Sequence, residues 1–277
     1  MQSISCIIPI HLNTEVEQID AALMSVFGQS LKIMETIISV DGPISNEMSN
    51  YLQSLMRSNE TLIIVTSDLN RGAGAARNRA IDAASGAYLM FLDADDLSAP
   101  TRAFEQLQYL IKNDLDGCYS DIIRRKKSND EKILYSPGLI PFSYKVLTLA
   151  PVGLPTLFIK KDVISRFRFP EHIRKAEDYW LFLSMMVCDV KLGSFKGCLY
   201  IYSLSEDDLI RRRGLKNALS DVMVRLRFIR HLKFFEKILV ALFCFILVLM
   251  RFAPKKLFSL LYRTSFRFRN RLNSTRN

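Results

Sequence analysis

Six uncharged residues are followed by three carboxylates within four positions in Ala87-Tyr88-Leu89-Met90-Phe91-Leu92-Asp93-Ala94-Asp95-Asp96. The apolar half has the length and composition of a central strand that is buried on both faces of a sheet. In open parallel sheets, ligands bind beyond the carboxyl ends of the strands, and the carboxylates lie at such an end. Neighbouring carboxylates repel one another unless a positive group lies among them, and Mn²⁺ and Mg²⁺ take oxygen ligands. The segment therefore predicts either a divalent-cation site or a solvated acidic turn that caps the next helix.

Strands and helices are predicted to alternate around this segment, which is typical of an α/β fold with a mostly parallel sheet and helices on both faces. Before residue 116 the apolar pattern predicts strands at 5–10, 34–40, 61–66 and 87–92, and helices at 15–27, 46–57, 75–84 and 100–112. Beyond it the pattern predicts strands at 117–124, 156–159 and 198–202, extended chain at 133–135, a solvated turn at 124–130, and helices at 162–167 and 174–188.

Polar residues follow three of the predicted strands at the point where each strand ends. They are residues 11–14, the pair Asp41-Gly42 and residues 93–96. Because the carboxyl ends of parallel strands share one edge of a sheet, we expect these polar groups to converge on one cleft.

A glycine-rich loop precedes the helix at 75–84, in Asn70-Arg71-Gly72-Ala73-Gly74-Ala75-Ala76-Arg77-Asn78. Its glycines let the backbone turn sharply and approach a ligand, and the start of a helix favours anions. Arg71 and Arg77 add positive charge suited to phosphate oxygens. The loop differs from a dinucleotide-binding Gly-x-Gly-x-x-Gly motif, because Arg77 stands at the third glycine position. The alternative interpretation is a loop whose small residues only pack the helix closely on the sheet.

Two further carboxylates, Glu177 and Asp178, open the helix at 174–188. Acidic residues in the first turn of a helix suit its dipole, which is the structural interpretation. The functional interpretation is that one of them is a general base, kept ionised by the preceding Arg174 and Lys175.

The chain of 277 residues is long enough for one large α/β domain with an appendage. No basic start followed by a long apolar run is visible at the N-terminus, so no secretory signal is predicted. The five cysteines form no Cys-x-x-Cys pair, and we interpret them as reduced packing residues of a cytoplasmic protein.

Over residues 3–200 the chain resembles the family 2 glycosyltransferases, which have the Rossmann-like GT-A fold. The resemblance is carried by the loop at residues 70–78, the acidic segment at 91–96, the pair Glu177-Asp178, and three further stretches: Ser5-Cys6-Ile7-Ile8-Pro9, Ser25-Val26-Phe27-Gly28-Gln29-Ser30 and Glu35-Thr36-Ile37-Ile38-Ser39-Val40-Asp41-Gly42. Each piece is weak alone, but their order and spacing are specific.

The resemblance implies a role for each motif in binding a nucleotide-sugar, usually a UDP-sugar, and transferring its sugar. Asp93 and Asp95 would bind Mn²⁺ or Mg²⁺, which bridges the donor diphosphate. Asp178, next to Glu177, would take the proton of the acceptor hydroxyl in a single inverting displacement. The donor would lie against Pro9, Ile10, His11, Asp41, Asn70, Arg71, Gly72, Gly74, Arg77, Asp93, Ala94 and Asp95.

The sequence departs from the family pattern in two places. The Gln-x-x-Arg-Trp signature of processive synthases is absent, so we expect transfer of one sugar at a time. Many relatives carry a His after the last strand, where this chain has Ser203-Leu204-Ser205. The sequence leaves two alternative functions. A sugar-nucleotide pyrophosphorylase needs a glycine-rich loop after the first strand, which is lacking here. The retained carboxylates argue against the other alternative, a catalytically degenerate GT-A membrane scaffold.

The C-terminal segment carries the whole excess of positive charge. Residues 205–277 hold 17 Lys and Arg against 5 Asp and Glu, whereas the whole chain has a net charge of +10. The apolar run at residues 238–250 is shorter than the ~20 residues that a membrane span needs.

We therefore predict a GT-A domain at 1–204 and a basic amphipathic helical region at 205–277, of which 234–277 lies on the cytoplasmic face of an anionic plasma membrane. This location suits a lipid-linked or saccharide acceptor in surface-polysaccharide assembly. A true span, a helix buried on the domain and nucleic-acid binding are the alternatives, and the catalytic half does not support nucleic-acid binding. The oligomeric state is not predicted.

Overall fold

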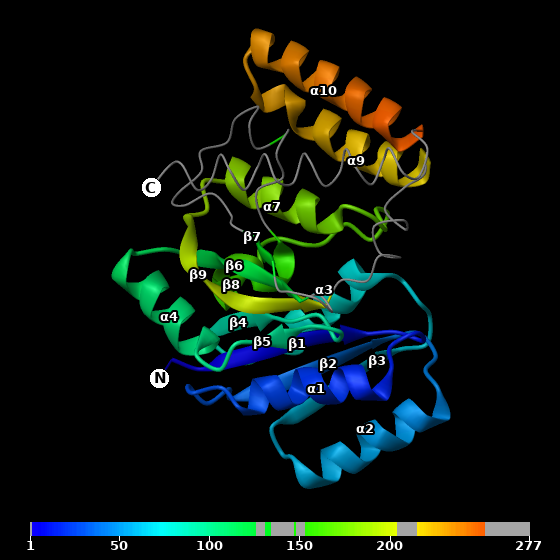
Figure 1. The fold of residues 1–277 in the computed structure, drawn as a ribbon, viewed down its shortest axis with the longest axis vertical. Coiled ribbons are helices and arrows are strands. Elements are labelled where there is room, and N and C mark those ends of the chain that lie inside the picture. The colour runs from blue at the N-terminus through cyan, green and yellow to red at the C-terminus, as the bar shows by residue number, and fades with distance from the viewer. Residues whose placement is uncertain (1, 126–130, 134–146, 148–152, 204–214, 253–277) are drawn as a thin grey trace.

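The computed structural model describes residues 2–125, 131–133, 147, 153–203 and 215–252. Figure 1 shows a central sheet with helices on both faces and a helix pair at one end. The strands and helices predicted in the first half are present in the predicted order, with one additional short strand at Leu97–Ser98. They are β1 (Ile4–Ile10), α1 (Val16–Phe27), β2 (Glu35–Asp41), α2 (Asn46–Ser58), β3 (Leu62–Ser67), α3 (Ala73–Ala83), β4 (Tyr88–Phe91), β5 (Leu97–Ser98) and α4 (Arg102–Lys112).

The second half contains short strands and helices that wrap around the same sheet. They are β6 (Gly117–Arg125), β7 (Glu131–Ile133), the 3-10 turn η1 (Leu154–Thr156), β8 (Phe158–Lys160), α6 (Lys161–Ile164), α7 (Glu177–Val187), β9 (Leu192–Ser203), α9 (Leu215–Phe228), the 3-10 turn η2 (Ile229–His231) and α10 (Phe234–Phe252). The turn predicted at 124–130 lies largely outside the described residues, as do most of the extended chain predicted at 133–135, Leu204 and Ser205, and the basic aromatic segment from 253 onward.

The sheet has nine strands in the order β3-β2-β1-β4-β8-β6-β9-β5, with β7 paired to β6. The four strands β3, β2, β1 and β4 are parallel, which confirms the predicted parallel core. The other half is mixed, because β8 runs antiparallel to both β4 and β6 whereas β6 and β9 are parallel. The predicted α/β fold class is confirmed by this sheet and the helices on its two faces.

Four of the predicted boundaries in the second half are wrong. The helix predicted at 174–188 begins only at Glu177, because Ala176 before it has a left-handed φ of +65°. The strand predicted at 156–159 begins at Phe158, because Pro155 lies in a 3-10 turn just before it. The helix predicted at 162–167 is a single turn that ends at Ile164. The last strand begins at Leu192, well before the predicted residue 198, because its pairing with β6 continues through an irregular register near Ser120 and Asp121. Local periodicity could not show this, since a bulge interrupts the alternation of side chains.

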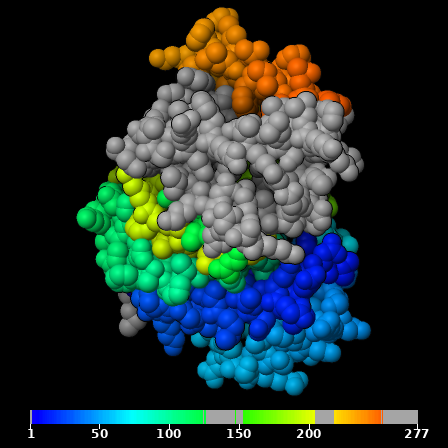
Figure 2. Space-filling model, viewed as in Figure 1, coloured from blue at the N-terminus to red at the C-terminus, as the bar shows by residue number. Residues whose placement is uncertain are grey.

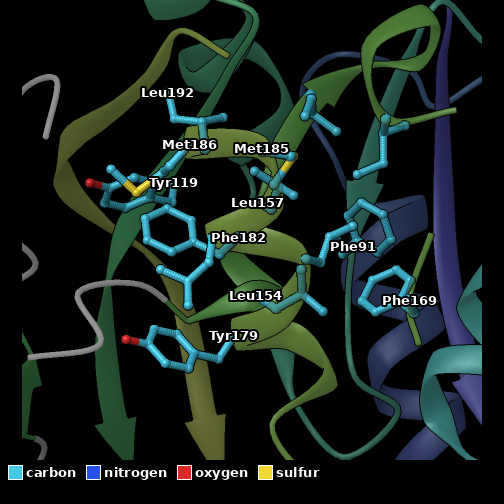
Figure 3. Close-up of a cluster of buried hydrophobic side chains, with 14 of the residues drawn as sticks. Phe91, Tyr119, Leu154, Leu157, Phe169, Tyr179, Phe182, Met185, Met186 and Leu192 are labelled. Carbon is cyan, nitrogen blue, oxygen red and sulfur yellow. The ribbon is translucent and has the colours of Figure 1, made fainter. Parts of the chain in front are cut away.

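Two hydrophobic clusters cover the two faces of the sheet, and the central strands contribute alternate residues to each. Cys6, Ile8 and Met90 point into the cluster beneath α1, α2 and α4. Ile7 and Phe91 point into the other cluster, which is packed by α3 and α7 and also contains buried residues of α9 and α10. Figure 3 shows part of this second cluster, with side chains from the sheet and from α7 in one layer.

Helices α9 and α10 lie beyond α7, at the end of the molecule opposite α2 (Figure 1). Val224 of α9 and Val240 of α10 are fully buried and belong to the cluster that also covers the sheet. Among the described residues, no helix combines the length and the apolar character that a membrane crossing requires. One face of α10 is buried in this hydrophobic cluster, and the other face is exposed.

Candidate functional site

The carboxylate of Asp41, at the end of β2, shapes the glycine-rich loop. It is almost fully buried and accepts hydrogen bonds from the backbone amides of Arg71 at 3.1 Å and Gly72 at 2.7 Å. The side chain of Asn70 donates to the backbone carbonyl of Asp41 at 3.2 Å. Arg79 adds an ion pair at 3.6 Å. Asp41 therefore holds the loop in place with both of its carboxylate oxygens, and the predicted contact of Asp41 with a donor stays a prediction.

Two glycines next to this loop are required by the backbone. Gly72 has φ +98° and Gly42 has φ +86°, a region that side chains with a Cβ rarely adopt. A Cβ at Gly42 would also lie 2.8 Å from the backbone nitrogen of Asn70. Gly74 has a different reason, because a Cβ there would come within 3.0 Å of Phe169 and 3.3 Å of Glu177. The predicted loop is thus built tightly on both β2 and α7.

Arg77 brings together three of the predicted motifs. Its guanidinium is buried and lies 2.7 Å from Asp93 Oδ1 and 3.5 Å from Glu177 Oε1, and it stacks on the ring of Phe169 at 5.7 Å. Burial alone would lower the pKa of Arg77, but the negative charges of Asp93 and Glu177 raise it above its ordinary value. The arginine therefore stays charged and joins the loop at the end of β4 to the first turn of α7.

The three carboxylates that follow β4 have different surroundings. Asp96 is fully buried, and its oxygens accept hydrogen bonds from the Tyr200 hydroxyl at 2.5 Å and from the Ser203 amide at 2.8 Å. Burial and the charges of Asp93 and Asp95 raise the pKa of Asp96 to about 8. Asp93 is half-buried and Asp95 is exposed, so these two are the carboxylates of this loop that solvent can reach.

A divalent cation fits the donor set that Asp93 and Asp95 provide. Both are carboxylates at the carboxyl end of a parallel strand, and Asp96 is already used by Tyr200 and Ser203. Within the described part of the chain, no three His, Cys, Asp or Glu side chains are grouped to hold a metal ion. Mg²⁺ and similar ions commonly take one or two protein carboxylates and complete their coordination with substrate phosphates and water, which matches this pair.

Glu177 and Asp178 form the first turn of α7, as predicted. The helix starts after Ala176, whose φ of +65° is in the left-handed region. Burial, together with the negative charge of Asp178, raises the pKa of Glu177 to about 7, against the lowering effect of Arg77. One oxygen of Asp178 accepts the Tyr179 amide at 2.7 Å. The carboxylates thus lie at the end of a helix that is otherwise buried.

Asn78 of α3, to which the sequence analysis assigns no role, binds the segment before α7. The Asn78 amide donates to the Phe169 carbonyl at 3.0 Å and accepts the Phe169 amide at 3.0 Å. Farther along, Arg71 forms an ion pair with Glu171, and Arg174 donates to the Asn70 carbonyl at 3.1 Å. The glycine-rich loop and the segment that leads to Glu177 therefore form one structure.

The other residues that were predicted to bind the nucleotide-sugar lie beside the glycine-rich loop. Pro9 and Ile10 pair with Ser39 and Val40 of β2, and Ile10 is buried. His11 is exposed, and its ring nitrogen Nδ1 lies 3.2 Å from the Thr14 hydroxyl. Ala94 is buried between Asp93 and Asp95. These residues share the sheet edge with Asp41.

Sequence reasoning missed Tyr200, Arg102, Asn78 and the structural role of Asp96. Tyr200 supports the acidic loop through its hydroxyl, and the fully buried Arg102 guanidinium stacks on its ring at 5.3 Å. Asn78 was visible within the glycine-rich motif, and Asp96 within the acidic one. Tyr200 lies 104 residues from Asp96, so no local pattern could indicate their pairing.

Comparison with known proteins points to one family. Residues 5–169 match the model described as Glycosyl transferase family 2. The chain is 27% identical over 183 residues to the UDP-Glc:alpha-D-GlcNAc-diphosphoundecaprenol beta-1,3-glucosyltransferase WfgD of Escherichia coli, covering 66% of this chain and 69% of that protein.

Two solved structures share the fold. TarS of S. aureus in complex with UDP-GlcNAc superposes with a TM-score of 0.65 at 16% identity, covering 80% of this chain and 65% of that one. Of a longer TarS chain only 43% is covered. The mannosyltransferase PcManGT of Pyrobaculum calidifontis, in complex with GDP-Man and Mn²⁺, gives a TM-score of 0.64 at 14% identity and covers 98% of this chain and 84% of that one.

Proposed function

The chain belongs to glycosyl transferase family 2 and is a glycosyltransferase, and on this premise we propose that it moves a single sugar from a UDP-sugar to a hydroxyl of a lipid-linked or saccharide acceptor in surface-polysaccharide synthesis. The observation that carries the proposal is the bridge made by Arg77 between Asp93 and Glu177. Asp93, which we propose as a metal ligand, and Glu177, which lies next to the proposed base, contact the same buried guanidinium.

The donor is proposed to lie along the carboxyl edge of β1, β2 and β4. The start of α3 follows the glycine-rich loop, and the start of a helix favours anions. The side chain of Arg71, which pairs with Glu171, adds positive charge that suits phosphate oxygens. A Mn²⁺ or Mg²⁺ ion would be held by Asp93 and Asp95, and it would supply positive charge to the diphosphate that leaves. Arg77 holds Asp93 in place from the protein side at 2.7 Å. A UDP donor is supported by the printed name of the Escherichia coli relative and by the ligand of TarS.

Asp178 is proposed as the general base, with Glu177 as its neighbour. The acceptor O–H bond breaks as its proton passes to the Asp178 carboxylate, and the oxygen forms a bond to the anomeric carbon. The bond between this carbon and the diphosphate oxygen breaks on the opposite face, and its electron pair leaves with UDP. One displacement inverts the configuration, and the protein needs no nucleophile of its own.

The acceptor is proposed to reach the site from the cytoplasmic face of the plasma membrane. The Escherichia coli relative is named for a diphosphoundecaprenol acceptor, which is a lipid. In this chain, α10 exposes large apolar side chains along one face, among them Phe235, Leu242, Phe245 and Leu249. The exposed Arg230 and Lys233 lie directly before this helix, which suits an anionic lipid surface.

The base assignment is tested by Asp178→Asn. This variant keeps the shape of the side chain but cannot take a proton, so we expect transfer to fall at least 10³-fold, while UDP binding with Mn²⁺ in calorimetry stays within twofold. Asp189→Asn is the matched control, because Asp189 is exposed at the other end of α7 and its φ of +55° suits asparagine. Transfer at the wild-type rate by Asp178→Asn would show that the base is another group.

The metal assignment is tested by Asp95→Ala. UDP should bind the wild type more tightly with Mn²⁺ than with EDTA, and this difference should disappear in the variant. If a panel of UDP-sugars is neither transferred nor hydrolysed by the wild type, the catalytic proposal fails and a scaffold role takes its place.

A further inference from the structure

Helix α9 lies between the helix that carries Glu177 and Asp178 and the outermost helix, α10 (Figure 1). One residue of α9, Arg225, contacts both neighbours. Its guanidinium lies over the ring of Tyr179 on α7 at 4.9 Å and over the ring of Phe243 on α10 at 5.5 Å. Tyr179 directly follows the two carboxylates, so Arg225 packs on the first turn of α7.

The environment of Arg225 shows that its position is tightly specified. The residue is only 5% exposed, its Nε donates to the Leu147 carbonyl at 2.7 Å, and its second nitrogen donates to the Asp221 carbonyl at 2.8 Å. The Asp221 carboxylate adds an ion pair at 3.8 Å. A buried arginine with these partners has one geometry, because leaving any of its donors or its charge unpaired is costly.

A second contact of α9 holds the next residue of α7. Phe228 packs edge-on against Trp180 at 5.3 Å, and His172 packs against the same indole at 6.0 Å. Phe228 and Tyr179 belong to the hydrophobic cluster that continues down to the sheet, and Figure 3 shows Tyr179 beside Leu154 and Phe182 in this cluster. The side of the first turn that faces α9 is therefore fixed by aromatic packing.

The opposite side of the same turn is held by α3. Gly74 leaves just enough room for Glu177 and Phe169, and Arg77 pairs with Glu177 at 3.5 Å. Residues 177–180 are thus held between α3 and α9, and Arg225 is the residue of α9 whose guanidinium lies over Tyr179.

We propose that Arg225 is a positioning residue for glycosyl transfer, which holds the first turn of α7, and with it Asp178 and Glu177, against α3. The inference rests on the proposed function. It assigns α9 a part in the reaction that is separate from any contact of α10 with lipid. Arg225 contacts the helix that bears the base and reaches no element of the proposed donor site, so its loss should act on the chemical step and spare donor binding.

The test compares Arg225→Met with Arg225→Lys in the full chain. Methionine keeps the unbranched aliphatic part of the side chain but removes its charge and hydrogen bonds. We expect kcat of Arg225→Met to fall at least tenfold, with the KM for the UDP-sugar and the Kd for UDP with Mn²⁺ within twofold of the wild type. Lysine keeps a positive charge near both rings but cannot make both hydrogen bonds, so its kcat should lie between those of Arg225→Met and the wild type. Arg227→Met is the matched control, because Arg227 lies on the same helix and is exposed.

The fluorescence of Trp180 provides a measurement that does not depend on catalytic activity. This residue is the only tryptophan of the chain and lies at the contact between α7 and α9. Its emission should shift to longer wavelength in Arg225→Met and stay unchanged in Arg227→Met. If Arg225→Met is insoluble, Phe228→Leu removes the ring against Trp180 while it keeps an apolar side chain, and the same separation of kcat from KM is expected.

The proposal is overturned if kcat stays within twofold of the wild type, if UDP binding falls together with kcat, or if Arg227→Met has the same effect. It can fail independently of the proposed function. A wild-type protein that turns over no UDP-sugar contradicts the function, and in that case an unchanged Trp180 emission in Arg225→Met would contradict the positioning of α7 as well.

Discussion

At the scale of single residues, the acidic loop shows how two neighbouring carboxylates can have different tasks. Asp96 is turned inward and bound by the Tyr200 hydroxyl at 2.5 Å, and the same hydroxyl accepts the Asp93 amide at 3.3 Å. Tyr200 thus holds the loop at two points. Because a buried polar group left without its hydrogen bond costs about 1–3 kcal/mol, this one hydroxyl stabilises the conformation of the loop that carries Asp93 and Asp95.

Replacement of Tyr200 by phenylalanine should therefore loosen the loop without removing the ring from the core. We expect Mn²⁺ to bind about tenfold more weakly in the presence of UDP, measured by calorimetry. Tyr51→Phe is the control, because it removes a similar hydrogen bond, to Asp20 at 2.7 Å, on the distant α2. Equal Mn²⁺ affinity in Tyr200→Phe and in the wild type would contradict the role given to this hydroxyl.

At the scale of elements, the first turn of α7 carries a carboxyl group, Glu177, whose ionised form is disfavoured by burial. The pKa of Glu177 is raised to about 7 by burial and by the charge of Asp178. The folded state therefore binds this proton more tightly than the unfolded chain does. The stability that follows from the raised pKa is present below the ordinary pKa of a glutamate and is lost as the pH rises through about 7.

The variant Glu177→Gln should remove this pH dependence. We expect wild-type stability to fall by on the order of 2 kcal/mol more than that of the variant between pH 5 and pH 8, measured by urea denaturation. Glu47→Gln, at an exposed position of α2, should retain the wild-type pH dependence. Parallel stability curves for the wild type and Glu177→Gln would show that the carboxylate is ionised over the whole range.

At the scale of the whole molecule, one hydrophobic cluster runs from the sheet through α7 and α9 to α10. Helix α10 ends this series and forms one end of the molecule in Figure 2. Its inner face is buried at Val240 and Cys244, and its outer face exposes Leu242 by 56% and Phe245 by 62%. A helix packed on one side and apolar on the other is suited to lie in the surface of a bilayer.

Introducing charge on this outer face should abolish membrane binding and leave the fold intact. We expect the wild type to sediment with phosphatidylglycerol vesicles, and the double variant Leu242→Glu with Phe245→Glu to stay in the supernatant with an unchanged melting temperature. Phe104→Glu with Ile111→Glu is the control, because both are exposed apolar residues on α4. A wild type that stays in the supernatant, or that forms dimers through this face, would contradict membrane docking.

The sequence by itself determined the parallel half of the fold and the residues that gather at its edge. Short apolar runs bounded by turn residues favour buried strands, and the helical spacing between these runs indicates crossover helices. Strands joined by such crossovers are parallel, so the carboxyl ends of β1, β2 and β4 lie at the same edge of the sheet. The motifs around Asp41, Gly72 and Asp93 were found for this reason.

Only the tertiary structure decided how these motifs are joined. Arg77 contacts both Asp93 and Glu177, and the Tyr200 hydroxyl binds the fully buried Asp96. The direction of β8 and the packing of α9 on α7 were also decided at this level. The physical reason is the same in each case: these contacts join segments far apart in the chain, and burial and shape select them, whereas local periodicity reports only which face of an element is apolar.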